Sequence, residues 1–181
     1  MSILCVYHVS TPDTPNKVLT HADDIASTLA EQGVGFERWS ANTRVEAGAS
    51  AAEVTAAYQE HIDSWMTAHG YAQVEVLSVS REHPQQEALA ASLRDEYRHE
   101  ADEIRLFAAG RGLLGLHIDD YVYTLLCEKH DLLRIPAGMP RWLDLGEEPR
   151  VVAISLFQTV AGAVAQRTGS DLAQGFPGLD D

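Results

Sequence analysis

The segment from residue 103 to residue 157 restricts the possible folds more than any other part of the sequence. It consists of short apolar runs separated by residues typical of turns, such as Asp119-Asp120 and Pro136-Ala137-Gly138. Repeated short strands with turns of this kind are typical of antiparallel barrels and jelly rolls. The predicted strands cover residues 103–108, 113–118, 121–126, 131–135 and 151–157. Gly110-Arg111-Gly112 is predicted to be a hairpin turn rather than a phosphate-binding loop, because no helix follows it.

The residues before this segment predict α/β elements that pack on the barrel. Apolar and β-branched residues alternate over residues 2–9, which favours a strand, and Gly33 is a suitable end for a helix that begins near Thr20. Ser50-Ala51-Ala52-Glu53 has the pattern of a capping box, so a helix with an apolar core face should follow it. A strand over residues 74–80 and a helix over residues 84–96 complete this part.

Size and composition favour one domain that binds neither nucleic acid nor a membrane. The chain has 181 residues, 45% of them apolar, which is enough for a single core. We expect one domain over residues 1–181, with α/β elements over 1–96, a barrel and its pocket over 97–160, and an irregular tail over 161–181. The net charge of −14 opposes binding to nucleic acid or to an anionic membrane. Cys5 and Cys127 lack metal-binding or redox spacing, so we expect reduced thiols and a cytoplasmic location.

Two segments carry the residue types from which a barrel can build a reactive site. His99 and Glu103 lie four residues apart within Glu96–Arg105, and the segment Ile135–Trp142 follows later in the chain. Small barrels bring a His, a carboxylate and a third group from a later strand to one interior point. Alone this spacing is a weak signal, because a His and a Glu in an acidic protein are more often solvated or merely hydrogen-bonded than bound to a metal.

Seven short motifs along the chain carry a family resemblance. They are Gly35-Phe36-Glu37-Arg38-Trp39, Ala56-Ala57-Tyr58-Gln59, Asp102-Glu103-Ile104-Arg105, Leu116-His117-Ile118, Leu126-Cys127-Glu128-Lys129, Ile135-Pro136-Ala137-Gly138 and Phe176-Pro177-Gly178-Leu179. In their order and spacing these motifs resemble the bacterial acireductone dioxygenases of the methionine salvage pathway. The resemblance covers nearly the whole chain and implies a mainly β fold with added α, a cupin double-stranded β-helix or jelly-roll barrel with flanking helices.

The resemblance also implies a metal site, and the sequence departs from it at two positions. Members of that family bind one iron or nickel ion through a His-x-His-x-x-x-Glu motif and a further His that precedes a Trp. His99 and Glu103 match this pattern, and Arg105 matches the arginine that contacts the substrate in the family. Tyr97 stands at the position of the first His, and Arg141 stands at the position of the last His.

Neither replacement is suited to hold a divalent cation. Tyrosine has an ordinary pKa of about 10, and a guanidinium group has no lone pair and stays protonated. We therefore expect no tightly bound metal, with His99 and Glu103 as the residual ligands of a weak iron or nickel site at most. Arg141 is expected to replace the charge of the metal, to pair with Glu103 in the free protein and to face an anionic ligand.

The substrate side of the predicted pocket differs as well. Leu93, Leu143 and Ala163 stand where the resemblance implies aromatic residues, and Trp142 follows the altered ligand position. The ligand is therefore expected to be a small anionic or enolisable molecule other than acireductone.

The expected chemistry is proton transfer, isomerisation, elimination or cofactor-free oxygenation. In this scheme His99 and Glu103 exchange protons, Arg105 and Arg141 stabilise negative charge, and Tyr97 donates a hydrogen bond. Two alternatives remain: a dioxygenase that recruits iron or nickel through Tyr97, His99 and Glu103, and a non-catalytic binding or regulatory protein. Either a monomer or a homodimer is compatible with the sequence.

Overall fold

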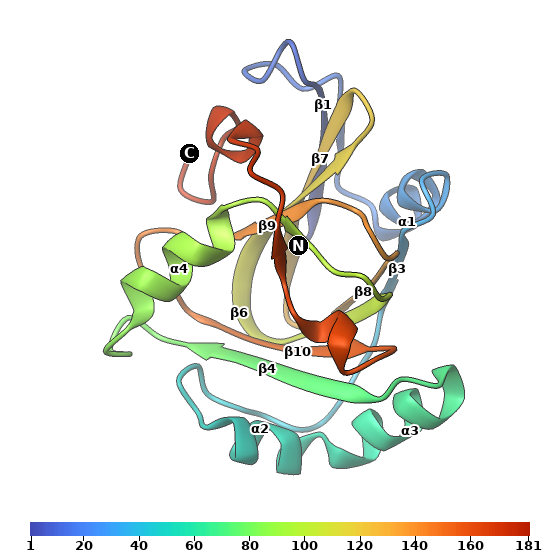
Figure 1. The fold of residues 1–181 in the computed structure, drawn as a ribbon, viewed down its shortest axis with the longest axis vertical. Coiled ribbons are helices and arrows are strands. Elements are labelled where there is room, and N and C mark those ends of the chain that lie inside the picture. The colour runs from blue at the N-terminus through green and yellow to red at the C-terminus, as the bar shows by residue number, and fades with distance from the viewer.

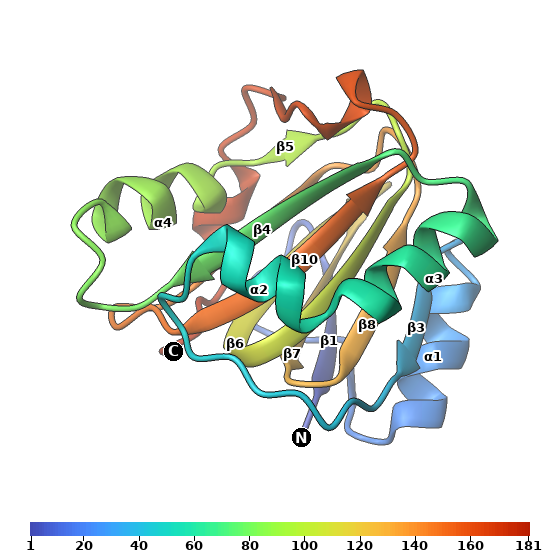
Figure 2. The ribbon, with the colours of Figure 1, turned by 90° about the horizontal axis from the view of Figure 1, so that it is seen from below.

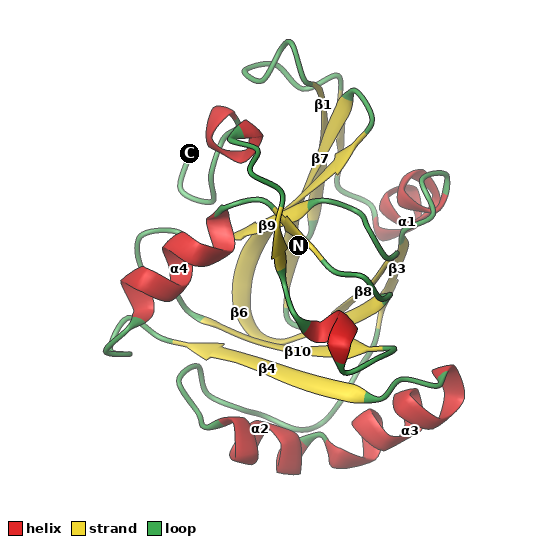
Figure 3. Cartoon of the chain, viewed as in Figure 1, coloured by secondary structure: helices red, strands yellow, loops and turns green.

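The computed structural model describes residues 1–181 and consists of strands wound into a barrel with four α-helices on its outside (Figures 1 and 3). The helices are α1 (Ala22–Ala30), α2 (Ala51–Ala57), α3 (Gln59–His69) and α4 (Gln86–Arg94), and single 3-10 turns cover Ala161–Ala163 and Leu172–Gly175. The strands are β1 (Ile3–His8), β2 (Lys17–Leu19), β3 (Gly35–Arg38), β4 (Gln73–Val79), β5 (Tyr97–Arg98), β6 (Glu103–Ile118), β7 (Tyr121–Glu128), β8 (Asp131–Ile135), β9 (Arg141–Asp144), β10 (Val151–Phe157) and β11 (Gln166–Arg167).

The long strand β6 joins the two halves of the barrel. Its first part pairs with β8 and β10, and its second part pairs with β7 and β9. The strand bends at Gly110, whose φ is +67°, and a Cβ atom there would lie 1.8 Å from the carbonyl oxygen of Arg150. Glycine is therefore required at this corner, because a side chain would have no space and would be strained at positive φ.

The predicted hairpin turn at Gly110-Arg111-Gly112 is wrong. Arg111 and Gly112 continue the strand and pair with Glu128 and Cys127 of β7. The glycines mark a bend by which one strand passes from one sheet to the other, and a bend needs the same residue types as a turn.

The N-terminal strands form part of the barrel wall. β1, β3 and β4 pair antiparallel with β7, β8 and β10, respectively, so they extend the sheet. The sequence had suggested α/β elements that pack on the barrel from outside. The strand order is β11-β5-β9-β6-β7-β1-β2 on one side and β4-β10-β6-β8-β3 on the other. Alternation along these strands points one set of side chains into the barrel and the other set outward.

Helices α2 and α3 cover the outer face of β4 and β10 (Figures 1 and 2). The N-cap half of the predicted capping box is present, since the Ser50 hydroxyl accepts a hydrogen bond of 3.1 Å from the backbone N–H of Glu53. The predicted helix is interrupted at Tyr58, whose buried ring packs with Val54 and Ile62 against outward-facing residues of β6 and β10. A second and larger cluster, which includes Leu4, Phe107, Leu114 and Leu125, fills the barrel interior.

The C-terminal segment runs back across one end of the barrel. β11 pairs with β5, and Phe176 packs its ring edge-on against Tyr7 of β1, with ring centroids 5.5 Å apart. No helix in the structure combines the length and the apolar character that a membrane crossing requires.

Candidate active site

Four strands bring the predicted site residues together. Glu103 and Arg105 alternate on β6 and therefore point to the same side of the strand. Arg105 is opposite Ser155 of β10, and Tyr97 of β5 is opposite Arg141 of β9. The side chains of these residues converge inside the barrel because the sheet register fixes each strand against the next.

Glu103 lies at the centre of the cluster and is completely buried. Its Oε1 accepts hydrogen bonds from Arg141 Nη1 at 2.6 Å and from Arg105 Nη2 at 3.2 Å. Its Oε2 accepts from Arg105 Nε at 2.9 Å and from the Ser155 hydroxyl at 2.6 Å. The expected ion pair between Arg141 and Glu103 is thus present, and both carboxylate oxygens are fully engaged.

These contacts hold Glu103 in its ionised form. Burial alone would raise its pKa, but the charges of Arg105 and Arg141 and the hydrogen bonds from Ser155 and Arg105 lower the pKa to about 2. Such a carboxylate accepts protons poorly at neutral pH. His99 and Glu103 were expected to exchange protons. Because Glu103 stays ionised, only His99 of the two is able to accept a proton at neutral pH.

His99 is buried and is held in one orientation. Its ring lies against Phe157, with centroids 4.5 Å apart, and its Nδ1 is 2.9 Å from the carbonyl oxygen of Gly162. A carbonyl oxygen only accepts, so Nδ1 carries the proton and Nε2 of the neutral ring keeps its lone pair. Burial, opposed by Glu103 and aided by Arg141, lowers the pKa of His99, which keeps the ring neutral at pH 7.

Arg105 has one guanidinium nitrogen, Nη1, whose N–H groups are unused. Its Nη2 donates to the Tyr97 hydroxyl at 3.1 Å and its Nε and Nη2 bind Glu103, while Nη1 is buried without a hydrogen-bond partner. An unpartnered buried guanidinium nitrogen costs free energy, and an acceptor brought by a ligand would recover it.

A pocket of about 310 Å³ opens beside this cluster. Tyr97, His99, Glu103, Arg105 and Ser155 form its polar side, and Arg167 of β11 lies at its edge, over the ring of Tyr97. The expected pocket residues Leu93, Leu143 and Ala163 are all in its wall. The remaining apolar residues of the wall are Val76, Leu77, Ala153, Phe157 and Ala165.

Two predicted residues do not reach this pocket. Arg141 is fully buried behind Glu103, where Nε and Nη2 donate to the carbonyl oxygens of Met139 and Pro136 at 3.1 and 3.2 Å. Trp142 is on the opposite face of β9, where it packs with Phe176 and Ala173. Arg141 was expected to contact the ligand directly. In the structure it instead holds Glu103 in place from behind and does not reach the pocket.

Ser155 and Arg167 were missed in the sequence. Ser155 is the one polar residue of the apolar strand β10, a signal that the sequence does contain. Arg167 is exposed in the tail and donates to the backbone carbonyls of Ser92 and Asp95 at 2.6 and 3.0 Å. No pattern in the tail indicates this position.

The side chains present do not fit a divalent metal ion. Both oxygens of Glu103 already bind guanidinium groups, and one of these groups belongs to Arg141, which stands where the resemblance implies the last metal-binding His. No group of three or more His, Cys, Asp or Glu residues is arranged to hold a metal. Two fixed positive charges beside a carboxylate repel a cation at that point.

Comparisons with known proteins identify the family. The model of the ARD/ARD′ family matches residues 4–165. Acireductone dioxygenases from Pseudomonas fluorescens Pf-5 and Pseudomonas syringae pv. tomato DC3000 are each 58% identical to this chain, over all of both proteins. The solved acireductone dioxygenase from Bacillus anthracis, with a cadmium ion in its active centre, covers 92% of this chain and 98% of its own at 23% identity and a TM-score of 0.76. This likeness confirms the predicted cupin-type fold, and the chain belongs to the acireductone dioxygenase (ARD/ARD′) family.

Proposed function

We propose that this protein binds a small organic anion in the pocket beside Arg105 and moves a proton on it without a tightly bound metal. The observation that carries the proposal is the unpartnered, buried Nη1 of Arg105 in a pocket with mostly apolar walls. Arg105 and Arg141 contribute two positive charges and Glu103 one negative charge, so the buried cluster carries a net charge of +1. One carboxylate or enolate balances this charge.

The pocket supports a ligand with a carboxylate or carbonyl at one end and a short aliphatic chain at the other. Arg105 Nη1 would donate to the ligand oxygen, and the Tyr97 hydroxyl, held by Arg105 Nη2, lies beside it. Leu77, Leu93 and Leu143 would contact the chain. This chemistry is that of a 2-oxo acid, which is both anionic and enolisable.

His99 would act as the base in such a reaction. Its neutral ring faces the pocket region with Nδ1 fixed on Gly162, so Nε2 is the atom that accepts the proton. Arg105 would stabilise the enolate that forms, and Arg141 would keep Glu103 and hence Arg105 in place. Proton transfer, isomerisation and elimination share this first step.

Proton exchange tests the proposal directly. Pyruvate and 2-oxobutyrate are incubated with the protein in D2O, and loss of the C3 proton signals is followed by NMR while binding is measured by calorimetry. We expect exchange with the wild-type protein and none with His99→Asn, whose amide can still donate to Gly162. His117→Asn is the matched control outside the pocket. Binding without exchange would support a non-catalytic binding protein. The absence of both binding and exchange would refute the proposal.

A metal-dependent acireductone dioxygenase is the second candidate, because the relatives at 58% identity carry that name and the Bacillus anthracis structure holds a metal ion. It requires iron or nickel to enter despite the two guanidinium groups. Elemental analysis after reconstitution and desalting, with oxygen consumption in the presence of acireductone, distinguishes the candidates. Stoichiometric metal with turnover would favour the dioxygenase.

A further inference from the structure

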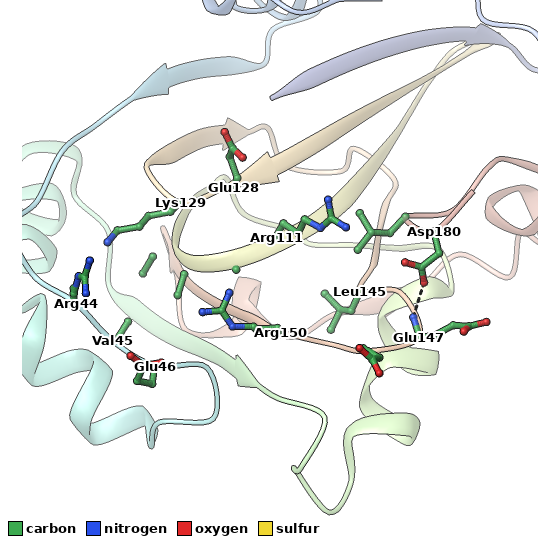
Figure 4. Close-up of a pocket in the computed structure, with 15 residues that line it drawn as sticks. Arg44, Val45, Glu46, Arg111, Glu128, Lys129, Leu145, Glu147, Arg150 and Asp180 are labelled. Carbon is green, nitrogen blue, oxygen red and sulfur yellow. Dashed lines mark hydrogen bonds between the residues drawn. The ribbon is translucent and has the colours of Figure 1, made fainter. Parts of the chain in front are cut away.

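The pocket beside Arg105 differs from a larger cavity, of about 980 Å³, at the bend of β6 (Figure 4). The wall of the larger cavity carries five carboxylates beside four cationic side chains, so no single sign of charge there selects a ligand. In the pocket beside Arg105, several polar side chains already make a hydrogen bond within the protein. That bond fixes whether each side chain donates to a ligand or accepts from it.

Arg105 and Tyr97 offer donors to a ligand. Arg105 has no acceptor atom, and its Nη1 is buried without a partner. The Tyr97 hydroxyl accepts the bond from Arg105 Nη2 at 3.1 Å and has no acceptor for its own proton. Tyr97 is only 3% exposed, so this proton is shielded from bulk water. Two buried donors therefore belong to one hydrogen-bonded pair of side chains, and an anionic oxygen suits both.

Ser155 offers an acceptor. Its hydroxyl donates to Glu103 Oε2 at 2.6 Å, because an ionised carboxylate only accepts. With this proton used, Ser155 Oγ has only lone pairs to offer a ligand. The side chain is half-buried and lines the pocket. His99 Nε2 accepts as well, but in the proposed reaction it receives the proton from carbon. Ser155 is therefore the acceptor that is left for a ligand hydroxyl.

The strand register orients a ligand between these groups. Ser155 of β10 is opposite Arg105 of β6 on one side and opposite Glu75 of β4 on the other. Directly opposite side chains lie on the same face of a sheet, with Cβ atoms about 5 Å apart. Glu75 also lines the pocket, and its carboxylate repels an anion and accepts hydrogen bonds. The anionic end of a ligand should therefore lie toward Arg105, and a donor should lie toward Ser155.

We infer that the ligand is a 2-oxo acid with a hydroxyl group on the neighbouring carbon, and that Ser155 selects this hydroxyl. The inference rests on the proposed function, in which a 2-oxo acid binds Arg105. An ammonium group can also donate, but an amino acid has no net charge and would leave the +1 charge of the buried cluster unbalanced. A 3-hydroxy-2-oxo acid carries the anion and the donor on three carbons.

Calorimetry with 3-hydroxypyruvate, 2-oxobutyrate and pyruvate tests the inference. The first two acids have the same number of non-hydrogen atoms and differ in a hydroxyl against a methyl group. We expect 3-hydroxypyruvate to bind the wild-type protein about fivefold more tightly than 2-oxobutyrate, because its hydroxyl gains a hydrogen bond. Ser155→Ala should abolish this preference, and Ser155→Thr, which keeps the hydroxyl, should retain it.

Ser78→Ala is the matched control. Ser78 is a half-buried serine of the neighbouring strand β4, and its hydroxyl accepts from the backbone N–H of Gly48 outside the pocket. This change should leave the preference as it is in the wild type. The inference is overturned if 2-oxobutyrate binds as tightly as 3-hydroxypyruvate, or if Ser155→Ala weakens both ligands equally and so leaves the preference intact.

Pyruvate separates this inference from the proposed function. Binding of pyruvate with no gain from the hydroxyl would overturn only the choice of a hydroxylated ligand. An absence of binding by all three acids would overturn the proposed function together with it.

Discussion

Replacing Glu103 by Gln removes the single negative charge that separates two buried guanidinium groups. The carboxyl is completely buried, and its pKa falls from an ordinary 4.5 to about 2. This difference corresponds to about 3 kcal/mol in favour of the ionised form. Breaking a buried ion pair by removing one partner costs about 3 to 5 kcal/mol. We expect Glu103→Gln to lower the free energy of unfolding at pH 7 by a similar amount, and the Tm by about 10 °C.

The stabilisation by ionised Glu103 should depend on pH in a definite direction. Because folding lowers the pKa of Glu103, its contribution is present above pH 4.5 and is lost as the pH falls toward about 2. Urea unfolding of the wild-type protein across this range should show a loss of about 3 kcal/mol that the variant lacks.

The double variant Glu103→Gln/Arg141→Met should be more stable than Glu103→Gln, because it removes one of the two like charges that the single change leaves buried. A single variant within about 1 kcal/mol of the wild type would refute this account of the cluster.

Three further predictions concern the corner, the histidine and the metal. Gly110→Ala should destabilise the protein by more than about 3 kcal/mol in urea unfolding, whereas Gly138→Ala, also at positive φ but with no atom within 4 Å of the added Cβ, should cost about 1 kcal/mol; equal costs would contradict the contact with Arg150. An NMR titration should give His99 a pKa below 6.5, since burial opposes its charge, and a higher value would argue against a neutral base. Tyr97→His/Arg141→His should retain nickel or iron after desalting in larger amount than the wild type, as measured by elemental analysis; no gain would show that the two residues do not block a metal.

The strands with turns at both ends were the predictable part of the fold. The predicted limits of 131–135 and 151–157 agree with β8 and β10, because polar or glycine-containing segments flank both runs. The corner at Gly110 was not predictable from local residues, since bends and hairpins use the same glycines. Helices α2 and α3 were predicted as one helix, but the backbone leaves helical geometry at Tyr58, whose φ is −112° and ψ is 18°, and no glycine or proline there signals a break.

The site was predictable in its residue types and less so in its geometry. The motif around His99 and Glu103 identified the cluster, but the free donor on Arg105 follows from the sheet register and from burial. The strand β9 is only four residues long and was not predicted. Had it been, alternation would have put Trp142 on the face opposite to Arg141 and Leu143, and away from the pocket.

The position of β6 in the chain determines the order in which the barrel can be assembled. All four strands that pair with it, β7 to β10, are made after it. The earlier strands β3, β4 and β5 pair with β8, β10 and β9, which are made later. β1 can pair early with β2, but its other partner, β7, also comes only after β6. Non-local pairing of this kind slows folding and leaves strand edges exposed during synthesis. The strands that are synthesised first are thus among the last to find their place in the sheet.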